Sequence, residues 1–230
     1  MANKAAWLPL ALGFCSRTEN MAYEKLLILE SAWSDEIADS RATREIYTSL
    51  ETLLSLQDDP IRIIQRPLLS SRYIDDIGQF VSLDANQRGP NVIILSAHGS
   101  YDLDIDNKGK RKHSRQLTAW DGDINISEDI RKINGNLSRS IFILDACEIG
   151  TEIKSFRAAI GALGVIGFSD SVDWIDSSVF VLTLLLRLQR SGVFHMERAG
   201  QERPKSILEE MKNGQYKSLM DSLNVEYSFA

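Results

Sequence analysis

The chain alternates short, continuous apolar runs with segments of helical periodicity. The first three apolar runs span residues 24–33, 61–68 and 89–99, and helical segments at 39–57 and 70–84 separate them. Runs of strand length that are apolar throughout are typical of strands buried on both faces of a sheet. A strand-helix-strand-helix-strand order therefore predicts a mostly parallel sheet with helices on both faces.

The same alternation continues in the second half of the chain. Strands are predicted at 139–147 and 165–169, a helix at 152–164 between them, and a buried helix at 176–192. The tail that follows is expected to form two short amphipathic helices and a terminal strand or coil. The whole pattern predicts a three-layer α/β/α sandwich with a mostly parallel central sheet of about five to six strands. Because no linker or repeat interrupts residues 1–230, we expect a single domain.

A polar insertion separates the two halves. Residues 100–115 show no apolar period, so they are predicted to form a long exposed loop. Residues 116–127 predict a hairpin that turns at Asp121-Gly122, and residues 127–137 predict a short helix capped by Ser127. The predicted loop carries the basic residues Lys108, Lys110, Arg111, Lys112 and Arg115, together with His113. Such a run is more typical of a solvated loop than of a nucleic-acid contact.

Composition excludes several classes of function. A net charge of -6 over 230 residues argues against nucleic acid or a membrane surface as the main partner. Two cysteines do not make a disulfide framework, which favours a cytoplasmic protein with reduced thiols. Residues 1–17 have the outline of a short signal peptide, but bulky Phe14 precedes Cys15 and no small-x-small cleavage site follows. We therefore expect a cytoplasmic protein.

Two predicted strands end in reactive residues. The strand at 89–99 ends in His98-Gly99, and the strand at 139–147 ends in Cys147. Since the carboxyl ends of parallel strands meet at one edge of a sheet, the imidazole and the thiol are expected to lie together. A histidine beside a cysteine can form a base–nucleophile pair, and the N–H groups of Gly99 and Cys147 can form an oxyanion hole. The alternative for each residue alone is that it packs without a chemical role.

These two segments resemble a known family. The histidine precedes the cysteine by about 50 residues, which is the order and spacing of caspases. The segments "ILSAHGSYD" and "FILDACEIG" are similar to the signature segments of caspase-like cysteine peptidases, and most similar to their CHAT branch. The hairpin turn at Asp121-Gly122, the helix that follows it, and "RAAIGALGVIGFSDSVDWIDSSVFVLTLLLRL" continue the resemblance.

The resemblance implies a cysteine endopeptidase with a caspase-like fold. His98 would be the general base or acid, and Cys147 the nucleophile. It implies no cofactor for the chemistry, and the sequence contains no metal-ligand spacing that we recognise. Small relatives are often switched on by another component, so an activating regulator is an expected partner besides the protein substrate.

The preference of the substrate pocket is left open by the sequence. One interpretation is an acidic pocket for a basic side chain, because acids flank the predicted strand ends. Its candidate lining residues are Glu30, Asp145, Glu148, Ser169, Asp170 and Asp173. A second interpretation assigns Arg41 or Arg44 to an acidic substrate residue, and a third treats all of these as solvated charges. If the enzyme cuts after basic residues, the basic run within 107–115 is a candidate site of self-cleavage.

Two other classes of function compete with a peptidase. A caspase-like fold can lose activity and serve as an interaction scaffold. A nucleotide- or flavin-binding α/β domain is disfavoured, because the segment after the first strand, "LLILESAWSDE", contains no glycine for a phosphate loop.

Overall fold

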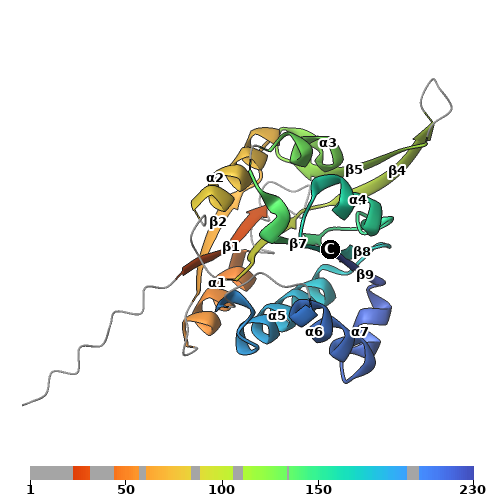
Figure 1. The fold of residues 1–230 in the computed structure, drawn as a ribbon. Helices are drawn as coiled ribbons and strands as arrows, with labels where there is room; N and C mark the ends of the chain where they lie inside the picture. Colours follow the sequence, from red (N-terminus) through yellow and green to blue (C-terminus); the bar gives the residue numbers. More distant parts are fainter. Residues whose placement is uncertain are drawn as a thin grey trace, which may run out of the picture.

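A computed structural model shows a six-stranded sheet at the centre of the molecule (Figure 1). Its strand order is β2-β1-β3-β7-β8-β9. The strands are β1 (Tyr23–Glu30), β2 (Ile61–Pro67), β3 (Asn91–Ser96), β7 (Ser140–Asp145), β8 (Gly164–Phe168) and β9 (Val225–Phe229). All neighbours are parallel except β9, which runs antiparallel to β8. The structure describes residues 23–31, 44–56, 61–83, 89–105, 111–133, 135–195 and 202–230, so the signal-like N-terminus lies outside the described part.

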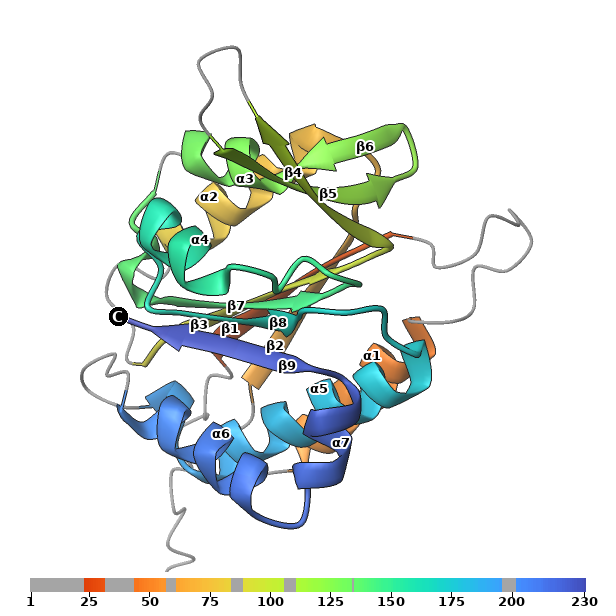
Figure 2. The same cartoon turned by 90° about the vertical axis from the view of Figure 1, so that its right-hand side faces the viewer.

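Helices cover both faces of this sheet, as Figure 2 shows. One face carries α1 (Arg44–Ser55), α5 (Trp174–Arg190), α6 (Glu202–Asn213) and α7 (Lys217–Ser222). The other carries α2 (Asp75–Leu83), α3 (Ile126–Asp129) and α4 (Ile153–Ile160). Short 3-10 turns lie at Ser71–Ile74, Ile130–Lys132, Leu137–Arg139 and Val193–His195. The predicted α/β/α sandwich with a mostly parallel sheet is confirmed.

The strands are buried on both faces, which explains their uninterrupted apolar sequence. In β1, Leu26 and Ile28 pack on the α1/α5 side, and Leu27 and Leu29 pack on the opposite side. Burying one such side chain contributes about 1.5–3 kcal/mol. The predicted buried helix is α5, and it buries one face, which includes Phe180, Leu184 and Leu188, while its first turns are partly exposed. No helix in the described part of the chain is long and apolar enough to cross a bilayer.

The prediction of an exposed loop over residues 100–115 is wrong. The structure places most of this segment in a second, three-stranded antiparallel sheet with the order β4-β5-β6. Its strands are β4 (Gly99–Ile105), β5 (Arg111–Ala119) and β6 (Gly122–Asn125), and the predicted turn at Asp121-Gly122 joins β5 to β6. In sequence, Tyr101, Leu103 and Ile105 alternate with aspartates, which is the period of a strand. The hairpin projects from the body (Figure 1), so it lacks the apolar content of a core strand.

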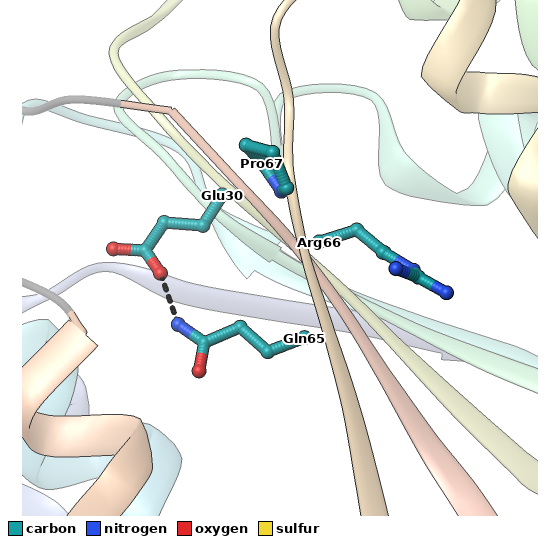
Figure 3. Close-up of a pocket in the computed structure, with 4 residues that line it drawn as sticks. All are labelled: Glu30, Gln65, Arg66 and Pro67. Atoms are coloured by element: carbon teal, nitrogen blue, oxygen red, sulfur yellow. Dashed lines mark hydrogen bonds between the residues drawn. The ribbon is translucent and has the colours of Figure 1, made fainter.

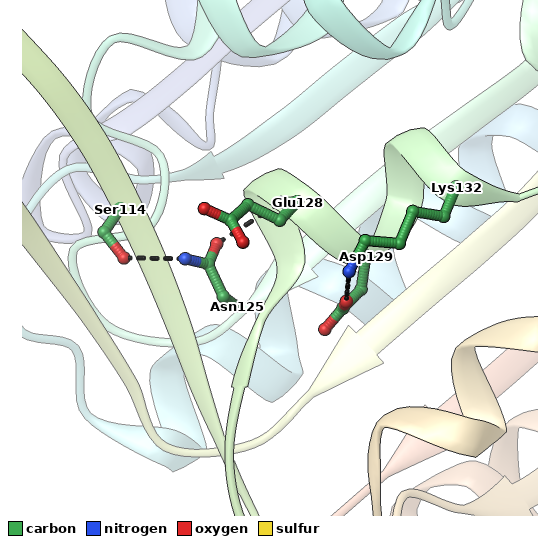
Figure 4. Close-up of polar contacts among 5 residues, drawn as sticks. All are labelled: Ser114, Asn125, Glu128, Asp129 and Lys132. Atoms are coloured by element: carbon green, nitrogen blue, oxygen red, sulfur yellow. Dashed lines mark hydrogen bonds and ion pairs between the residues drawn. The ribbon is translucent and has the colours of Figure 1, made fainter.

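The helix after this hairpin begins earlier than predicted, and Ser127 is not its cap. Asn125 precedes α3, and its side-chain oxygen accepts a hydrogen bond from the Glu128 N–H at 3.3 Å. The amide of the same side chain donates to Ser114 Oγ at 3.1 Å, as Figure 4 shows. Asn125 thus satisfies an orphan donor at the start of the helix and ties the helix to β5.

Candidate functional site

The carboxyl ends of β3 and β7 lie side by side, as the sequence predicts. Ser96 and Asp145 are Cα partners in the ladder between these strands, and the Ala97 N–H donates to the Asp145 carbonyl at 3.2 Å. His98 and Cys147 each follow this paired row by two residues, and both side chains are half-buried. The two predicted reactive residues therefore leave the same edge of the sheet on neighbouring strands.

Gly99 packs directly against the backbone of Cys147. A Cβ atom at Gly99 would lie 2.6 Å from the Cys147 carbonyl oxygen and 2.8 Å from Ala146 Cβ. Atoms do not approach so closely without a shift, so only glycine lets the two segments meet at this distance. The segment that begins at His98 and the segment that holds Cys147 are thus in van der Waals contact.

The pairing of β4 with β5 also orients the Gly99 amide. The Thr118 N–H donates to the His98 carbonyl at 2.9 Å, and Gly99 is the Cα partner of Leu117. In an antiparallel ladder the row next to a hydrogen-bonded pair directs its N–H groups away from the partner strand. The Gly99 N–H therefore points away from β5 and is not used in the ladder with it.

The Cys147 thiol contacts the segment after β8. The Val172 N–H lies 3.5 Å from Cys147 Sγ, and the Val172 carbonyl oxygen lies 4.0 Å from it. An N–H donor at the sulfur is placed to stabilise a thiolate. Val172 was not among the residues that the sequence suggested, because a backbone contact leaves no signature in a side chain.

A strained turn follows Cys147. The Ile149 N–H donates to the Cys147 carbonyl at 2.7 Å, which closes a three-residue turn centred on Glu148. Glu148 has a φ of 60°, in the left-handed region that non-glycine residues avoid. Such γ-turns are rare and strained. Because Ile149 and Glu148 both donate to carbonyls, Glu148 to Asp170 at 3.0 Å, neither amide is available to an oxyanion.

Asp145 lies beneath the site rather than on its surface. This side chain is 1% exposed, and its carboxylate accepts hydrogen bonds from Ser96 Oγ at 2.9 Å and from the Tyr47 hydroxyl at 3.2 Å. The prediction that Asp145 lines an open substrate pocket is therefore corrected. It shares the α1/α5 face of the sheet with Ser96, because neighbouring residues of a parallel ladder point the same way.

Burial raises the pKa values of both Asp145 and Tyr47. It raises the pKa of Asp145, although the hydroxyl groups of Ser96, Ser177 and Tyr47 oppose the change. Burial also raises the pKa of Tyr47 well above its usual range, with the nearby charges of Asp145 and Glu30 adding to the effect. Tyr47 thus stays a neutral donor to the carboxylate at every physiological pH.

Glu30 borders a cavity at the end of β1 and β2. The cavity has a volume of about 320 Å³ and is lined by Glu30, Gln65, Arg66 and Pro67. Glu30 is 8% exposed and accepts a 2.6 Å hydrogen bond from Gln65 Nε2. Figure 3 shows these two side chains together on one side of the strands and Arg66 on the other. The Glu30 side chain therefore borders this cavity together with Gln65.

The three predicted pocket residues after β8, Ser169, Asp170 and Asp173, make different contacts. Asp173 caps α5, because its Oδ1 accepts from the Ile175 N–H at 2.8 Å and from the Asp176 N–H at 3.2 Å. Asp170 is exposed, and its carbonyl accepts from Glu148, so it lies next to the Cys147 turn. Ser169 turns to the start of β9, where its N–H and hydroxyl both donate to the Asn224 carbonyl.

The structure thus brings together only part of the predicted set. His98, Gly99, Cys147, Glu148 and Asp170 share the rim, Glu30 borders a cavity, and Asp145 and Ser169 are directed elsewhere. Within the described ranges, no group of three or more His, Cys, Asp or Glu side chains is placed to hold a metal ion.

Comparison with known proteins identifies no family. No protein-family model and no curated protein matches the chain. Among solved structures, the chain is similar to the crystal structure of protein GSU0716 from Geobacter sulfurreducens, with 13% sequence identity and a TM-score of 0.44. That match covers 90% of this chain and 92% of the other.

Proposed function

We propose that the protein is a cysteine endopeptidase that uses His98 and Cys147 as a base–nucleophile pair. One observation carries this proposal: the segments that bear the two residues leave neighbouring strands at one edge of the sheet and touch through Gly99. Ligands of open parallel sheets bind at this edge. The resemblance of "ILSAHGSYD" and "FILDACEIG" to caspase-like peptidases supports the same assignment.

The chemistry follows from the groups at the rim. His98 takes the proton of the Cys147 thiol, and the thiolate attacks the scissile carbonyl carbon. The carbonyl oxygen becomes an oxyanion, which the N–H groups of Gly99 and Cys147 stabilise. His98 then gives its proton to the leaving amine. In the second step His98 takes a proton from the water that attacks the thioester carbonyl and returns it to the sulfur as the C–S bond breaks and the acid leaves. Every proton is thus returned, and no cofactor takes part.

We propose a preference for a basic side chain before the scissile bond. The Glu30 side chain borders a cavity, and Asp170 is exposed beside the Cys147 turn. Asp173 adds negative charge but also caps α5. A lysine or arginine side chain in this cavity would gain a charge-assisted hydrogen bond.

Self-cleavage in the basic run remains part of the proposal, with one restriction. Arg115 is only 2% exposed and lies within β5, so the bond after it is not accessible. Lys108 and Lys110 lie outside the described residues. Full-length masses of both wild-type and Cys147→Ala protein after incubation, with no fragments of either, would contradict self-cleavage. An activating partner and a cytoplasmic location complete the proposed setting.

The decisive experiment is labelling with peptide electrophiles that carry lysine, arginine or aspartate next to the reactive group. We expect labelling by the basic probes in wild type and in Cys15→Ala, and none in Cys147→Ala. His98→Ala should slow labelling by about a hundredfold or more, as loss of a general base does. Equal labelling of wild type and His98→Ala would contradict the proposed pair.

A non-catalytic interaction domain is the second candidate. Trp174, Ile175 and Val179 expose large apolar side chains at the start of α5, directly after the segment that contacts Cys147. Exposed apolar patches mark interaction sites. Absence of labelling by every probe, with an intact fold, would favour this candidate over the peptidase.

A further inference from the structure

Arg115 is a buried cation at the centre of the contact between β5 and the Cys147 turn. Only 2% of it is exposed. Its Nε donates to the Ile149 carbonyl at 2.9 Å, and one terminal guanidinium nitrogen donates to the Thr151 carbonyl. Both acceptors lie within the four residues that follow Cys147, so one side chain holds two points of this segment.

Two aromatic rings fix the guanidinium in place. Its central carbon lies 5.3 Å from the centroid of the Tyr101 ring and 4.7 Å from that of Phe156. Tyr101 is itself hydrogen-bonded to His113 Nδ1 and stacked on that ring. Arg115 therefore connects β4 and β5, through these rings, to the start of α4.

Burying a cation is unfavourable unless it is compensated. Burial lowers the pKa of Arg115, while the negative charge of Glu152 acts in the opposite direction. The two backbone carbonyls and the two rings supply that compensation. A planar fork that donates in two directions is a property of arginine, and lysine does not reproduce it.

The segment that Arg115 contacts contains strained backbone. Glu148 has a φ of 60° and Glu152 a φ of 54°, so two strained residues flank the carbonyls of Ile149 and Thr151. Strained backbone persists only where the surroundings fix it. Cys147 is joined to this segment by the hydrogen bond from the Ile149 N–H to its carbonyl. A change at the guanidinium therefore reaches the nucleophile through one residue.

We propose that Arg115 is a positioning residue that holds the turn after Cys147 in its strained conformation and thereby sets the reactivity of the thiol. The catalytic importance of this role rests on the proposed function, but its test measures only the reactivity of the thiol. It makes the β4–β5 hairpin, which also carries Gly99, a structural part of the site. Arg115 contacts no substrate and acts only through the turn.

The test measures the thiol itself. In a Cys15→Ala background, the rate of Cys147 alkylation by iodoacetamide is followed by mass spectrometry from pH 5 to pH 9. We expect Arg115→Lys to slow alkylation by about tenfold and to shift the pH at which the rate is half-maximal, since two charged hydrogen bonds are lost. The matched control is Arg157→Lys, which alters a single hydrogen bond to the Ala162 carbonyl and should leave both readouts unchanged.

A second variant separates positioning from general stability. Glu148→Gly removes the strain at the turn, because glycine adopts a positive φ freely. Added to Arg115→Lys, it should restore most of the alkylation rate. A purely structural role predicts instead that Arg115→Lys lowers the unfolding midpoint while the rate and its pH profile stay as in wild type, and this result would overturn the proposal.

If Arg115→Lys does not fold, Tyr101→Leu provides a second test, because it removes one of the two rings that support the guanidinium. It is expected to slow alkylation of Cys147 as well, and an unchanged rate would overturn the proposal.

The outcomes also separate this inference from the peptidase. If wild type cleaves no peptide but Arg115→Lys still slows alkylation, the positioning role stands and the proposed function falls. If wild type cleaves peptides and Arg115→Lys alkylates as fast as wild type, the proposed function stands and the positioning role falls.

Discussion

Ser96 Oγ donates a 2.9 Å hydrogen bond to the carboxylate of Asp145, across the last paired row of β3 and β7. Both residues are buried, and each stands two positions before a candidate catalytic residue. The bond therefore joins the two strand ends immediately below the rim. Its strength should influence how well the His98 and Cys147 segments stay together.

Ser96→Ala should destabilise the protein by about 1–3 kcal/mol, because a buried carboxylate loses a donor. Ser140 provides the matched control. It is equally buried, at the other end of β7, and its hydroxyl has no hydrogen-bond partner among the described residues. Ser140→Ala should be neutral or stabilising. Urea denaturation of both variants tests the contrast, and equal losses would show that the Ser96–Asp145 bond contributes little.

Asp145→Asn should change how stability depends on pH. Burial raises the pKa of Asp145 above its value in the unfolded chain, which is about 3.9. Below that pH the carboxyl is protonated in the folded and the unfolded state, and the folded protein has its full stability. As pH rises through the folded-state pKa, the buried carboxyl becomes charged and the free energy of unfolding of wild type falls. Asparagine does not titrate, so the free energy of unfolding of the variant relative to wild type should increase from pH 4 to pH 8. A difference that is constant with pH would contradict this.

The sheet could be predicted because its strands are buried on both faces. Ile94 and Ile143 are central, fully buried residues of runs that are apolar throughout, and no other pattern explains such runs followed by helical periods. The β4–β5 hairpin could not be predicted in the same way. The hairpin contributes Leu117 and Ala119 to the core, and in sequence its apolar residues alternate with polar and charged ones, so its composition matches that of a loop.

The rim was predictable to the same extent as the sheet. His98 and Cys147 follow apolar strands, so parallel topology alone brings them to one edge. The supporting contacts were not predictable, because they depend on side-chain direction and on tertiary packing. Asp145 is the last residue of the strand that Cys147 follows, yet the Asp145 side chain points to the α1/α5 face and bonds to Tyr47. Arg115 lies among charged residues of a polar segment, and nothing in that sequence distinguishes it from Lys112.

Gly99→Ala tests the contact between the two segments. A methyl group 2.6 Å from the Cys147 carbonyl oxygen must move the backbone, which should cost about 1–3 kcal/mol. It should also slow alkylation of Cys147, because the turn shifts with the carbonyl. Gly135→Ala is the control, since its nearest neighbours are Val81 and Gly78 on α2 and not the Cys147 turn, so it should leave alkylation unchanged. Thermal unfolding and alkylation that are unchanged in Gly99→Ala would contradict the contact.

Asp173→Ala and Asp173→Asn distinguish the role of Asp173 as the N-cap of α5 from the effect of its negative charge. Both remove the negative charge, but asparagine keeps an oxygen that can accept from Ile175 and Asp176. Asp173→Ala should therefore lower stability by about 0.5–2 kcal/mol and slow Cys147 alkylation, because the neighbouring Val172 loses its support. Asp173→Asn should do neither. If both variants behave alike in thermal unfolding and alkylation, the charge rather than the cap accounts for the effect.

Glu30→Gln tests the proposed preference for basic side chains. Glutamine keeps an oxygen that can accept from Gln65 Nε2, so the fold around the cavity should be retained, while the charge that would pair with a substrate cation is lost. We expect KM for lysine and arginine reporter peptides to rise by about tenfold or more, with kcat nearly unchanged, because the lost contact is uniform binding energy. Glu226→Gln removes the same charge from an exposed position on β9 and should have no effect. Cleavage of aspartate reporters alone, or a Glu30→Gln variant with wild-type kinetics on lysine reporters, would assign the preference to other residues than Glu30.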